Sequence, residues 1–322
     1  FNEYLNAFVL IYILRDKLGW GVSEEPGFIF NMSAGYNLEG IKSPTVQHFF
    51  DRMSDCSAEL AEKIERIAAF YPRVQELSIP GSMSNNITVS TMHGCPPEEV
   101  EKIGRYFVEE RGFHTTIKLN PTLLGAERLR NILNHRLGFS TEVPDEAFGH
   151  DLKYDDGVAL IGAMLDAARD KGVAFSLKLT NTLETSNIEQ NLPKNEGMIY
   201  MSGRALHPIS INLAARLQEE FKGVLDISFS AGIDCFNILD TLSCGLRPVT
   251  VCSDVLKPGG YGRLSQYLDQ IAGAMQNAGA DSLQNLILDR ANITNETAAG
   301  LANLKAYAAD VVENGRYAKE KF

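Results

Sequence analysis

Residues 115–121, TTIKLNP, are the stretch that decides the fold class of this sequence. They form a short β-rich run that ends in polar residues, and residues 174–181, AFSLKLTN, have the same organisation. A longer segment of helical period, residues 158–171, lies between the two runs. The order strand, helix, strand is typical of a parallel sheet with helical crossovers, and it predicts an α/β protein.

The same alternation extends over most of the chain. Six runs are predicted as strands: 28–33, 87–92, 115–120, 174–180, 225–231 and 248–254. Amphipathic segments are predicted as helices: 3–18, 46–70, 98–110, 158–171, 209–221, 236–244, 271–280 and 297–312. The first helix is expected to pack through Tyr4, Phe8, Ile11 and Leu14, and the polar residues 131–157 are predicted to be an inserted loop.

Neither an internal repeat nor a Pro/Gly/Ser-rich linker divides the sequence. Residues 1–322 are therefore predicted to form a single domain. Its parts would be a helical segment at 1–27, the strands and crossovers at 28–260, and further helices at 261–322.

Polar residues gather at the carboxyl ends of the predicted strands, which is where the active sites of (β/α)8 TIM barrels lie. The glycine-rich motifs GxGxxG and GxxxxGK[ST], typical of nucleotide-binding open sheets, are absent from the sequence. Both observations favour the barrel. A barrel has eight strands, so six predicted strands and a start at Phe1 lead us to expect that the first two strands are missing.

The formal charge is 30 − 41 = −11, which argues against nucleic acid or an anionic membrane as the main partner. The first apolar stretch, residues 8–14, is too short to span a bilayer. The five cysteines form no CxxC pair, so we expect free thiols, a cytoplasmic location and no metal site.

Residues 91–98, TMHGCPPE, place His93 and Cys95 directly before a predicted helix. The amino end of a helix lowers the pKa of a nearby thiol, so Cys95 is a candidate acid, base or nucleophile. The alternative interpretation is a small buried thiol in a tight turn.

Two lysines, Lys118 and Lys178, end predicted strands. A lysine at a barrel mouth can hold an anionic ring or phosphate, or form a Schiff base when its pKa is lowered. The alternative is a strand-end lysine that reaches solvent. Because strand register decides which side chains face inward, only one of the two is expected to do so.

The pairs Ala231–Gly232 and Cys252–Ser253 end the last two predicted strands. Many barrels bind phosphate at this place through backbone N–H groups, which need no basic side chain. An anion site of this kind is compatible with the negative net charge. Gly232 could equally be an ordinary glycine of a strand-to-helix turn.

Six runs carry a resemblance to a known family: FNMSAGYNLEGI (30–41), STMHGCPPEE (90–99), KLNPTLLG (118–125), KLTNT (178–182), MSGRALHP (201–208) and VLKPGGY (255–261). They resemble the flavin barrel of dihydroorotate dehydrogenases and dihydropyrimidine dehydrogenase. The similarity is greatest to the barrel of the large iron–sulfur flavoproteins named selenate reductase subunits, and it covers nearly the whole chain. It implies a TIM barrel of the dihydroorotate dehydrogenase type, with strands three to eight in this chain and extra helices at both ends.

The resemblance also implies roles for individual residues. Cys95, with His93, would exchange a proton with the substrate. Flavin mononucleotide (FMN) would contact Asn31, Lys118, Thr180, Asn181, Ser202, Gly203, Ala231, Gly232, Cys252 and Ser253. Asn120, Asn181 and Thr182 would contact the substrate. The sequence departs from the dehydrogenases at Met92, where they have asparagine, and at Ala231, where they have glycine.

The implied function is an oxidoreductase that transfers hydride between FMN and a purine-like or pyrimidine-like ring. Its partners would be iron–sulfur, FAD and NAD(P)H modules elsewhere in the full protein, or subunits such as a molybdenum hydroxylase. Two alternatives stay open: an aldolase-type barrel with a Schiff base on Lys118 or Lys178, and a non-catalytic scaffold between redox modules.

Overall fold

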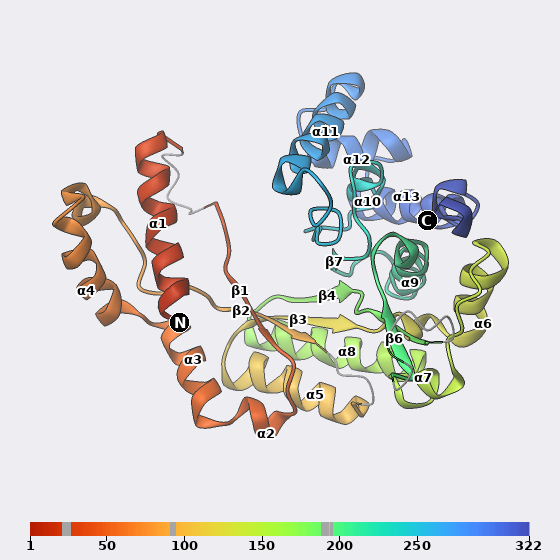
Figure 1. The fold of residues 1–322 in the computed structure, drawn as a ribbon, viewed down its shortest axis with the longest axis horizontal. Helices are drawn as coiled ribbons and strands as arrows, with labels where there is room; N and C mark the ends of the chain where they lie inside the picture. Colours follow the sequence, from red (N-terminus) through yellow and green to blue (C-terminus); the bar gives the residue numbers. More distant parts are fainter. Residues whose placement is uncertain (21–26, 91–94, 188–192, 194–195, 322) are drawn as a thin grey trace.

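The computed structural model describes residues 1–20, 27–90, 95–187, 193 and 196–321 (Figure 1). An all-parallel sheet has the order β1-β2-β3-β4-β7. Its strands are β1 (Asn31–Ala34), β2 (Asn86–Ser90), β3 (His114–Leu119), β4 (Phe175–Leu179) and β7 (Ile227–Phe229). Each parallel strand follows its neighbour without a reversal of order, as in a barrel wall and unlike a doubly wound sheet.

The last predicted strand, residues 248–254, is reduced to a single bridge between Val249 and Phe229. Two hydrogen bonds flank this bridge: the Phe229 N–H donates to the Pro248 carbonyl at 3.0 Å, and the Thr250 N–H donates to the Phe229 carbonyl at 2.8 Å. Pro248 has no N–H to extend the ladder. The prediction of a full strand here was wrong, although the segment lies where that strand would begin.

Helices surround the sheet. Their bounds are α1 (Asn2–Leu18), α2 (Leu38–Ile41), α3 (Pro44–Ser54), α4 (Ser57–Ala68), α5 (Pro97–Arg105), α6 (Ala126–Arg130), α7 (Asp145–His150), α8 (Tyr154–Lys171), α9 (His207–Glu220), α10 (Ile238–Ser243), α11 (Leu264–Ala278), α12 (Leu283–Ala291) and α13 (Glu296–Val311). The predicted helix 46–70 is in fact two helices, because the Cys56 N–H bonds to the Gly81 carbonyl at 2.7 Å instead of continuing α3.

The predicted loop at residues 131–157 was also wrong. A π-helical segment, Asn131–Arg136, continues α6, and α7 follows before α8 begins. Leu133 and Leu137 are buried in the main core, as are Phe139 and Val143. These apolar side chains are spaced too irregularly to show a helical period, which explains why the segment looked unstructured in the sequence.

The outer face of the sheet is apolar and covered by helices. Ile87, Ile117, Leu177 and Ile227, one on each of four strands, are buried. Figure 1 shows α5 and α8 side by side along the sheet, and α8 and α9 both contact β4. α8 ends at Gly172 (φ 73°), a left-handed conformation that glycine adopts without strain, so that its N–H can bond back to the last turn.

A β-hairpin interrupts the alternation of strand and helix between β4 and α9. Its strands, β5 (Leu183–Ser186) and β6 (Met198–Met201), pair antiparallel, outside the main sheet. The hairpin was not predicted, because its strands are only four residues each and lack a long apolar run.

The buried apolar residues form two clusters, one on each side of the molecule. One includes residues of α1, α3, β1 and β2, and the other includes residues of β3, β4, β7 and the helices that follow. α1 packs through Leu5, Phe8 and Val9, so the predicted face was right for Phe8. It was wrong for Tyr4 and Leu14, which are 49% and 43% exposed. Among the described residues, the helices are all too short or too polar to cross a bilayer.

Candidate functional site

The inner face of the sheet is polar, in contrast to its outer face. In-register partners across the strands form three rows of polar side chains: Asn31, Asn86 and His114; Ser33, Thr88, Thr116 and Ser176; Ser90, Lys118, Lys178 and Ser228. Within these rows the Thr88 hydroxyl donates to Asn31 Oδ1 at 2.8 Å, and the Thr116 and Ser176 hydroxyls lie 2.7 Å apart. A parallel sheet covered on both sides is apolar on both faces, so this face is suited to water or a polar ligand.

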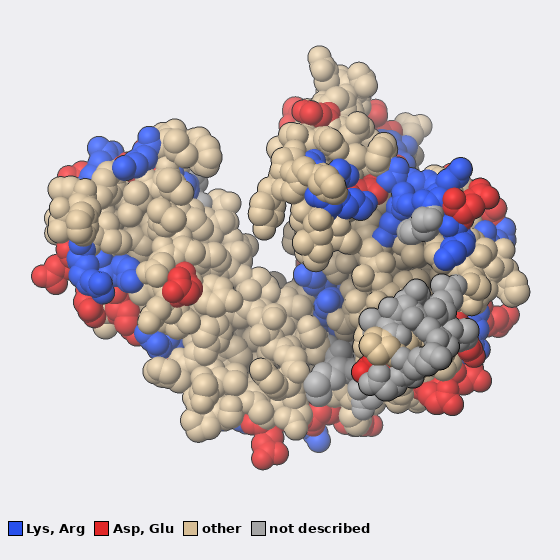
Figure 2. All heavy atoms as spheres, in the orientation of Figure 1, with Lys and Arg blue, Asp and Glu red and all other residues tan. Residues whose placement is uncertain are grey.

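A hollow of about 880 Å³ lies over this face, and the sheet forms its floor. Its lining includes Asn31, Asn86, Thr88, Thr116, Ser176, Lys178 and Ser228, together with Gly27, Phe28, Ile29, Pro248 and Thr250. Figure 2 shows the surface hollowed between the side that carries α1 and α4 and the side that carries α11. The volume is in the range of ligand sites that take a cofactor or a drug-sized molecule.

Lys118 and Lys178 lie side by side as register partners on β3 and β4. Both are half-buried on the inner face, so the expectation that only one faces inward was wrong. Burial lowers the pKa of both lysines, and the charge of Lys178 lowers the pKa of Lys118 further. Cys252 has the opposite effect on the pKa of Lys118, which places this thiol near the lysine pair.

The predicted substrate asparagines meet at the ends of the same two strands. The Asn181 amide donates to Asn120 Oδ1 at 2.7 Å, and the Asn181 N–H donates to the Leu119 carbonyl at 2.8 Å. Thr180 is buried, with its hydroxyl 2.9 Å from that of Ser210, while Thr182 is exposed. Asn120 and Asn181 thus form one amide pair, whereas Thr180 faces α9 and Thr182 faces solvent.

Three turns from distant parts of the sequence converge at Gly203, Gly232 and Ser253. Gly203 (φ 72°) and Gly232 (φ 59°) adopt conformations that favour glycine. A Cβ on Gly232 would lie 2.7 Å from the Arg204 Cα, which leaves no room for a side chain, and a Cβ on Gly203 would lie 3.4 Å from the Ser253 hydroxyl. We call these three turns, residues 202–203, 231–232 and 252–253, the turn cluster; Ser202, Cys252 and Ser253 are exposed in it and Ala231 is buried.

Cys95 is half-buried directly before α5. Burial raises the pKa of its thiol above the ordinary value, and the charge of Glu99 raises it further. Glu99 is fixed there because its carboxylate accepts the Leu38 N–H at 3.0 Å. The prediction of a lowered pKa at this helix end was therefore wrong, and the thiol is protonated near neutral pH. His93 lies outside the described residues.

A buried carboxylate that the sequence did not single out, Asp254, follows the turn cluster. Burial opposes its ionisation, but hydrogen bonds from Arg263, Tyr267 and Lys257 lower its pKa to about 2. These contacts fix the segment after residue 253 against α11. The fully buried His207 was likewise not identified in advance, although the run MSGRALHP contains it.

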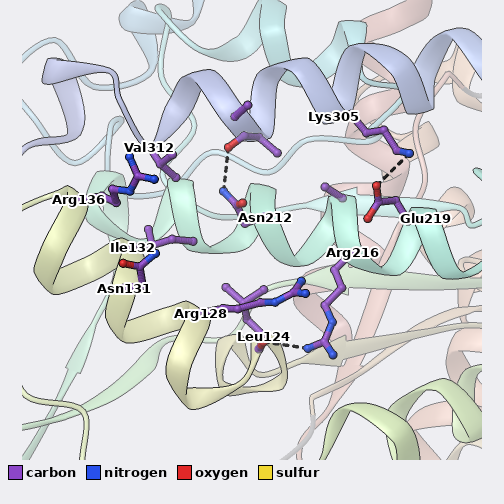
Figure 3. Close-up of a pocket in the computed structure, with 13 residues that line it drawn as sticks. Leu124, Arg128, Asn131, Ile132, Arg136, Asn212, Arg216, Glu219, Lys305 and Val312 are labelled. Atoms are coloured by element: carbon purple, nitrogen blue, oxygen red, sulfur yellow. Dashed lines mark hydrogen bonds and ion pairs between the residues drawn. The ribbon is translucent and has the colours of Figure 1, made fainter.

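A second hollow, of about 460 Å³, lies among α6, α9 and α13 and contains no predicted site residue (Figure 3). Its cations mostly have partners: Lys305 pairs with Glu219 at 2.9 Å, and Arg216 donates to the Leu124 carbonyl at 2.9 Å. The first hollow is therefore the better candidate site, because Lys178 lines it and Lys118 is the register partner of Lys178.

Strand order and the position of the turn cluster define a class: an α/β-barrel domain with its polar groups at the carboxyl ends of the strands. The chain belongs to the family described as "Oxidoreductase YgfK, N-terminal TIM-barrel domain", whose model matches residues 1–319. The predicted TIM-barrel fold class is thereby confirmed, and so is its place in an oxidoreductase family.

Two relatives agree with this assignment. The chain is 43% identical over 293 residues to "Putative oxidoreductase YgfK" of Escherichia coli strain K12 and to the protein of the same name in Escherichia coli O157:H7. Each alignment covers 85% of this chain and 28% of the relative, so the chain spans little more than a quarter of these proteins.

Solved structures with a similar arrangement include two dihydroorotate dehydrogenases (DHODH) from Eimeria tenella. The ligand-free enzyme gives a TM-score of 0.36 at 17% identity, covering 65% of this chain and 64% of that chain. The complex with ferulenol gives 0.35 at 16% identity, covering 70% and 66%. The family assignment rests on the family model and the relatives, not on these structures.

Proposed function

We propose that this domain binds FMN and is the site of hydride transfer to or from a flat nitrogen heterocycle, purine-like or pyrimidine-like. The observation that carries the proposal is the turn cluster beside a polar hollow. Glycine at 203 and 232 lets the three turns approach one another closely, and backbone N–H groups at such turns can bind a phosphate group. When bound, FMN supplies the hydride chemistry, which no amino acid side chain provides.

The chain's own residues would divide the binding between two places. The turn cluster would hold the phosphate through Gly203, Gly232 and Ser253. Lys118 and Lys178, together with Asn31, would hold the polar edge of the ring system on the inner face of the sheet. Because two half-buried cations lie side by side there, a ligand that carries negative charge removes their mutual repulsion.

The amide pair would orient the substrate. The Asn181 amide donates to Asn120 Oδ1 at 2.7 Å and lies 3.5 Å from the Lys118 carbonyl oxygen, so the pair presents amide groups, which can recognise the edge of a heterocycle, beside the two lysines. Cys95 would hold the proton that the substrate gains or loses. A thiol with a raised pKa is a proton donor at neutral pH, which agrees with the direction of ring reduction.

The test uses the full-length protein with its native cofactors. The flavins released on denaturation should include one FMN per chain besides any FAD of the other modules. The Cys95→Ser protein should keep that FMN but lose most of its turnover with reducible purines and pyrimidines. Unchanged turnover in Cys95→Ser would reject the proton role and favour the scaffold alternative.

The rest of the protein would deliver the electrons. Since the chain spans 28% of its relatives, most of their length is available for other modules. We propose iron–sulfur, FAD and NAD(P)H modules there, with a molybdenum hydroxylase as a candidate partner subunit, and a cytoplasmic location. None of the described residues that line the hollow explains a reaction with selenate.

The paired lysines also favour a second candidate function. A lysine with a lowered pKa beside another cation is a suitable nucleophile for Schiff-base chemistry with a carbonyl substrate. Borohydride would then trap a carbonyl substrate on Lys118 or Lys178, and Lys→Arg variants at the two positions would abolish trapping. A protein that binds FMN and traps no carbonyl compound would exclude this candidate.

A further inference from the structure

A buried network of hydrogen bonds contacts the turn at Ala231–Gly232 on its core side. His207 Nδ1 lies 2.8 Å from the Ala231 carbonyl oxygen, and His207 Nε2 lies 2.8 Å from the Tyr307 hydroxyl. The Asn237 amide donates to the Gly232 carbonyl at 2.9 Å and to the Tyr317 hydroxyl at 3.3 Å. Both carbonyls of the turn therefore point into the core.

For a neutral His207 imidazole, these hydrogen bonds allow only one assignment of donors and acceptors. A carbonyl can only accept, so Nδ1 of His207 carries the proton and Nε2 accepts from Tyr307. Tyr307 in turn lies 3.4 Å from the Tyr317 hydroxyl, and the Tyr317 ring stacks on the imidazole at 5.3 Å. Burial lowers the pKa of His207 to about 4, so the imidazole is neutral, as the arrangement requires.

The orientation of the carbonyls determines that of the next N–H groups. In a trans peptide the C=O of one residue and the N–H of the next point in opposite directions. Because the Ala231 and Gly232 carbonyls point at His207 and Asn237, the N–H groups of Gly232 and Ile233 point away from the core. Within the described part of the chain, neither N–H has a hydrogen-bond partner.

We propose that His207 is a positioning residue for anion binding: together with Asn237, it orients the Gly232 and Ile233 N–H groups as a pair of donors for a phosphate group. Two successive N–H groups that point the same way form an anion-binding nest. Tyr307 and Tyr317, near the C-terminal end, complete the hydrogen-bond network that orients the turn. The C-terminal segment would thereby contribute to ligand binding. The ligand named, the phosphate of FMN, rests on the proposed function.

The experiment compares FMN with riboflavin, which lacks the phosphate, in titrations of the full-length apoprotein. His207→Leu should weaken FMN binding about tenfold, as expected for one buried carbonyl left without its donor, and riboflavin binding less than about twofold. His207→Asn places an amide donor near the position of Nδ1 and should recover most of the FMN affinity. If His207→Leu fails to fold, Tyr307→Phe, which removes only a hydroxyl, takes its place. This variant should also weaken FMN binding more than riboflavin binding, by a smaller factor.

Asn303 provides the matched control, since it is a buried side chain of α13 that donates to Ser243 and Ile287 and not to the turn. Asn303→Ala should lower the stability and leave the ratio of FMN to riboflavin affinity unchanged. Equal losses for both flavins in the folded His207 or Tyr307 variants would overturn the proposal.

A second measurement separates this proposal from the proposed function. Inorganic phosphate should slow hydrogen exchange in the peptide that covers residues 228–237 of the wild type, and not in His207→Leu or, for a non-folding variant, Tyr307→Phe. If the wild type shows this protection but binds no FMN, the proposed function fails and the positioning role stands. If phosphate gives no protection in the wild type, the positioning role fails.

Discussion

The two faces of the central sheet differ in the polarity of their side chains. Leu177 faces the helices and is 1% exposed, whereas its neighbours Ser176 and Lys178 line the hollow. Apolar and polar side chains alternate along these strands, as in an antiparallel sheet with one face in the core and one face in water, although every strand in this sheet is parallel. The outer face stabilises the fold, and the inner face is available for a ligand.

The largest effect should come from breaking the outer face. Leu177→Ala should lower the free energy of unfolding by about 2–5 kcal/mol, because it leaves a cavity in the main core. Ser176→Ala, the adjacent inner-face control, should cost about 1 kcal/mol for its hydrogen bond to Thr116. Urea denaturation measures both, and equal costs would contradict the division between the faces.

His207, which contacts the outer-face ring of Phe229 at 5.3 Å, should give the next largest effect. Its folded pKa of about 4 is below the unfolded value of about 6.5, so the unfolded state binds more protons between these pH values. Stability should therefore fall by up to about 3 kcal/mol as the pH drops from 6.5 to 4. His207→Asn should remove this component from the pH dependence of urea denaturation, and an unchanged slope would count against the buried neutral imidazole.

Gly232→Ala tests the ligand side of the comparison. A Cβ there meets the Gly203 backbone, and the positive φ disfavours any other residue. We expect at least about a tenfold loss of FMN affinity, which corresponds to about 1.4 kcal/mol of binding free energy. Gly245→Ala, also at positive φ but with open space around it, is the matched control and should leave FMN affinity unchanged.

The smallest effect concerns the inner-face cations. The folded pKa values of both lysines are lowered, so the unfolded state binds more protons just below the ordinary lysine pKa, and wild-type stability should rise with pH in that alkaline range. Lys178→Met should reduce this increase in stability. It removes one lysine with a lowered pKa, and it removes the positive charge that lowers the pKa of Lys118. Lys171→Met, at the exposed end of α8, should not alter the slope.

Local sequence patterns predicted the strands β1, β2, β3, β4 and β7 and the polar character of their carboxyl ends, since both depend on short-range alternation. They could not predict that Lys118 and Lys178 share a face, because that depends on the register between two strands about 60 residues apart. The raised pKa of Cys95 was missed because burial is a tertiary property.

The buried network of His207 shows the same limit more strongly. Its partners Ala231 and Tyr307 lie 24 and 100 residues away in the sequence. A histidine followed by proline in an apolar helix is compatible with an ordinary core position, and only the fold reveals that it holds a turn. Gly232 of that turn, in contrast, was identified from the sequence as the glycine of a turn at a strand end, and its φ of 59° is one that favours glycine.

The central claim is that the inner face of the sheet and the turn cluster together bind FMN. The most direct test is the visible absorption spectrum of the full-length apoprotein titrated with FMN, for the wild type and for Gly232→Ala. The account predicts that the wild type takes up one FMN per chain in this domain, with the shifted bands of a protein-bound flavin, and that Gly232→Ala binds it much more weakly. A wild type that binds no FMN, or a Gly232→Ala variant that binds it equally well, would contradict the claim.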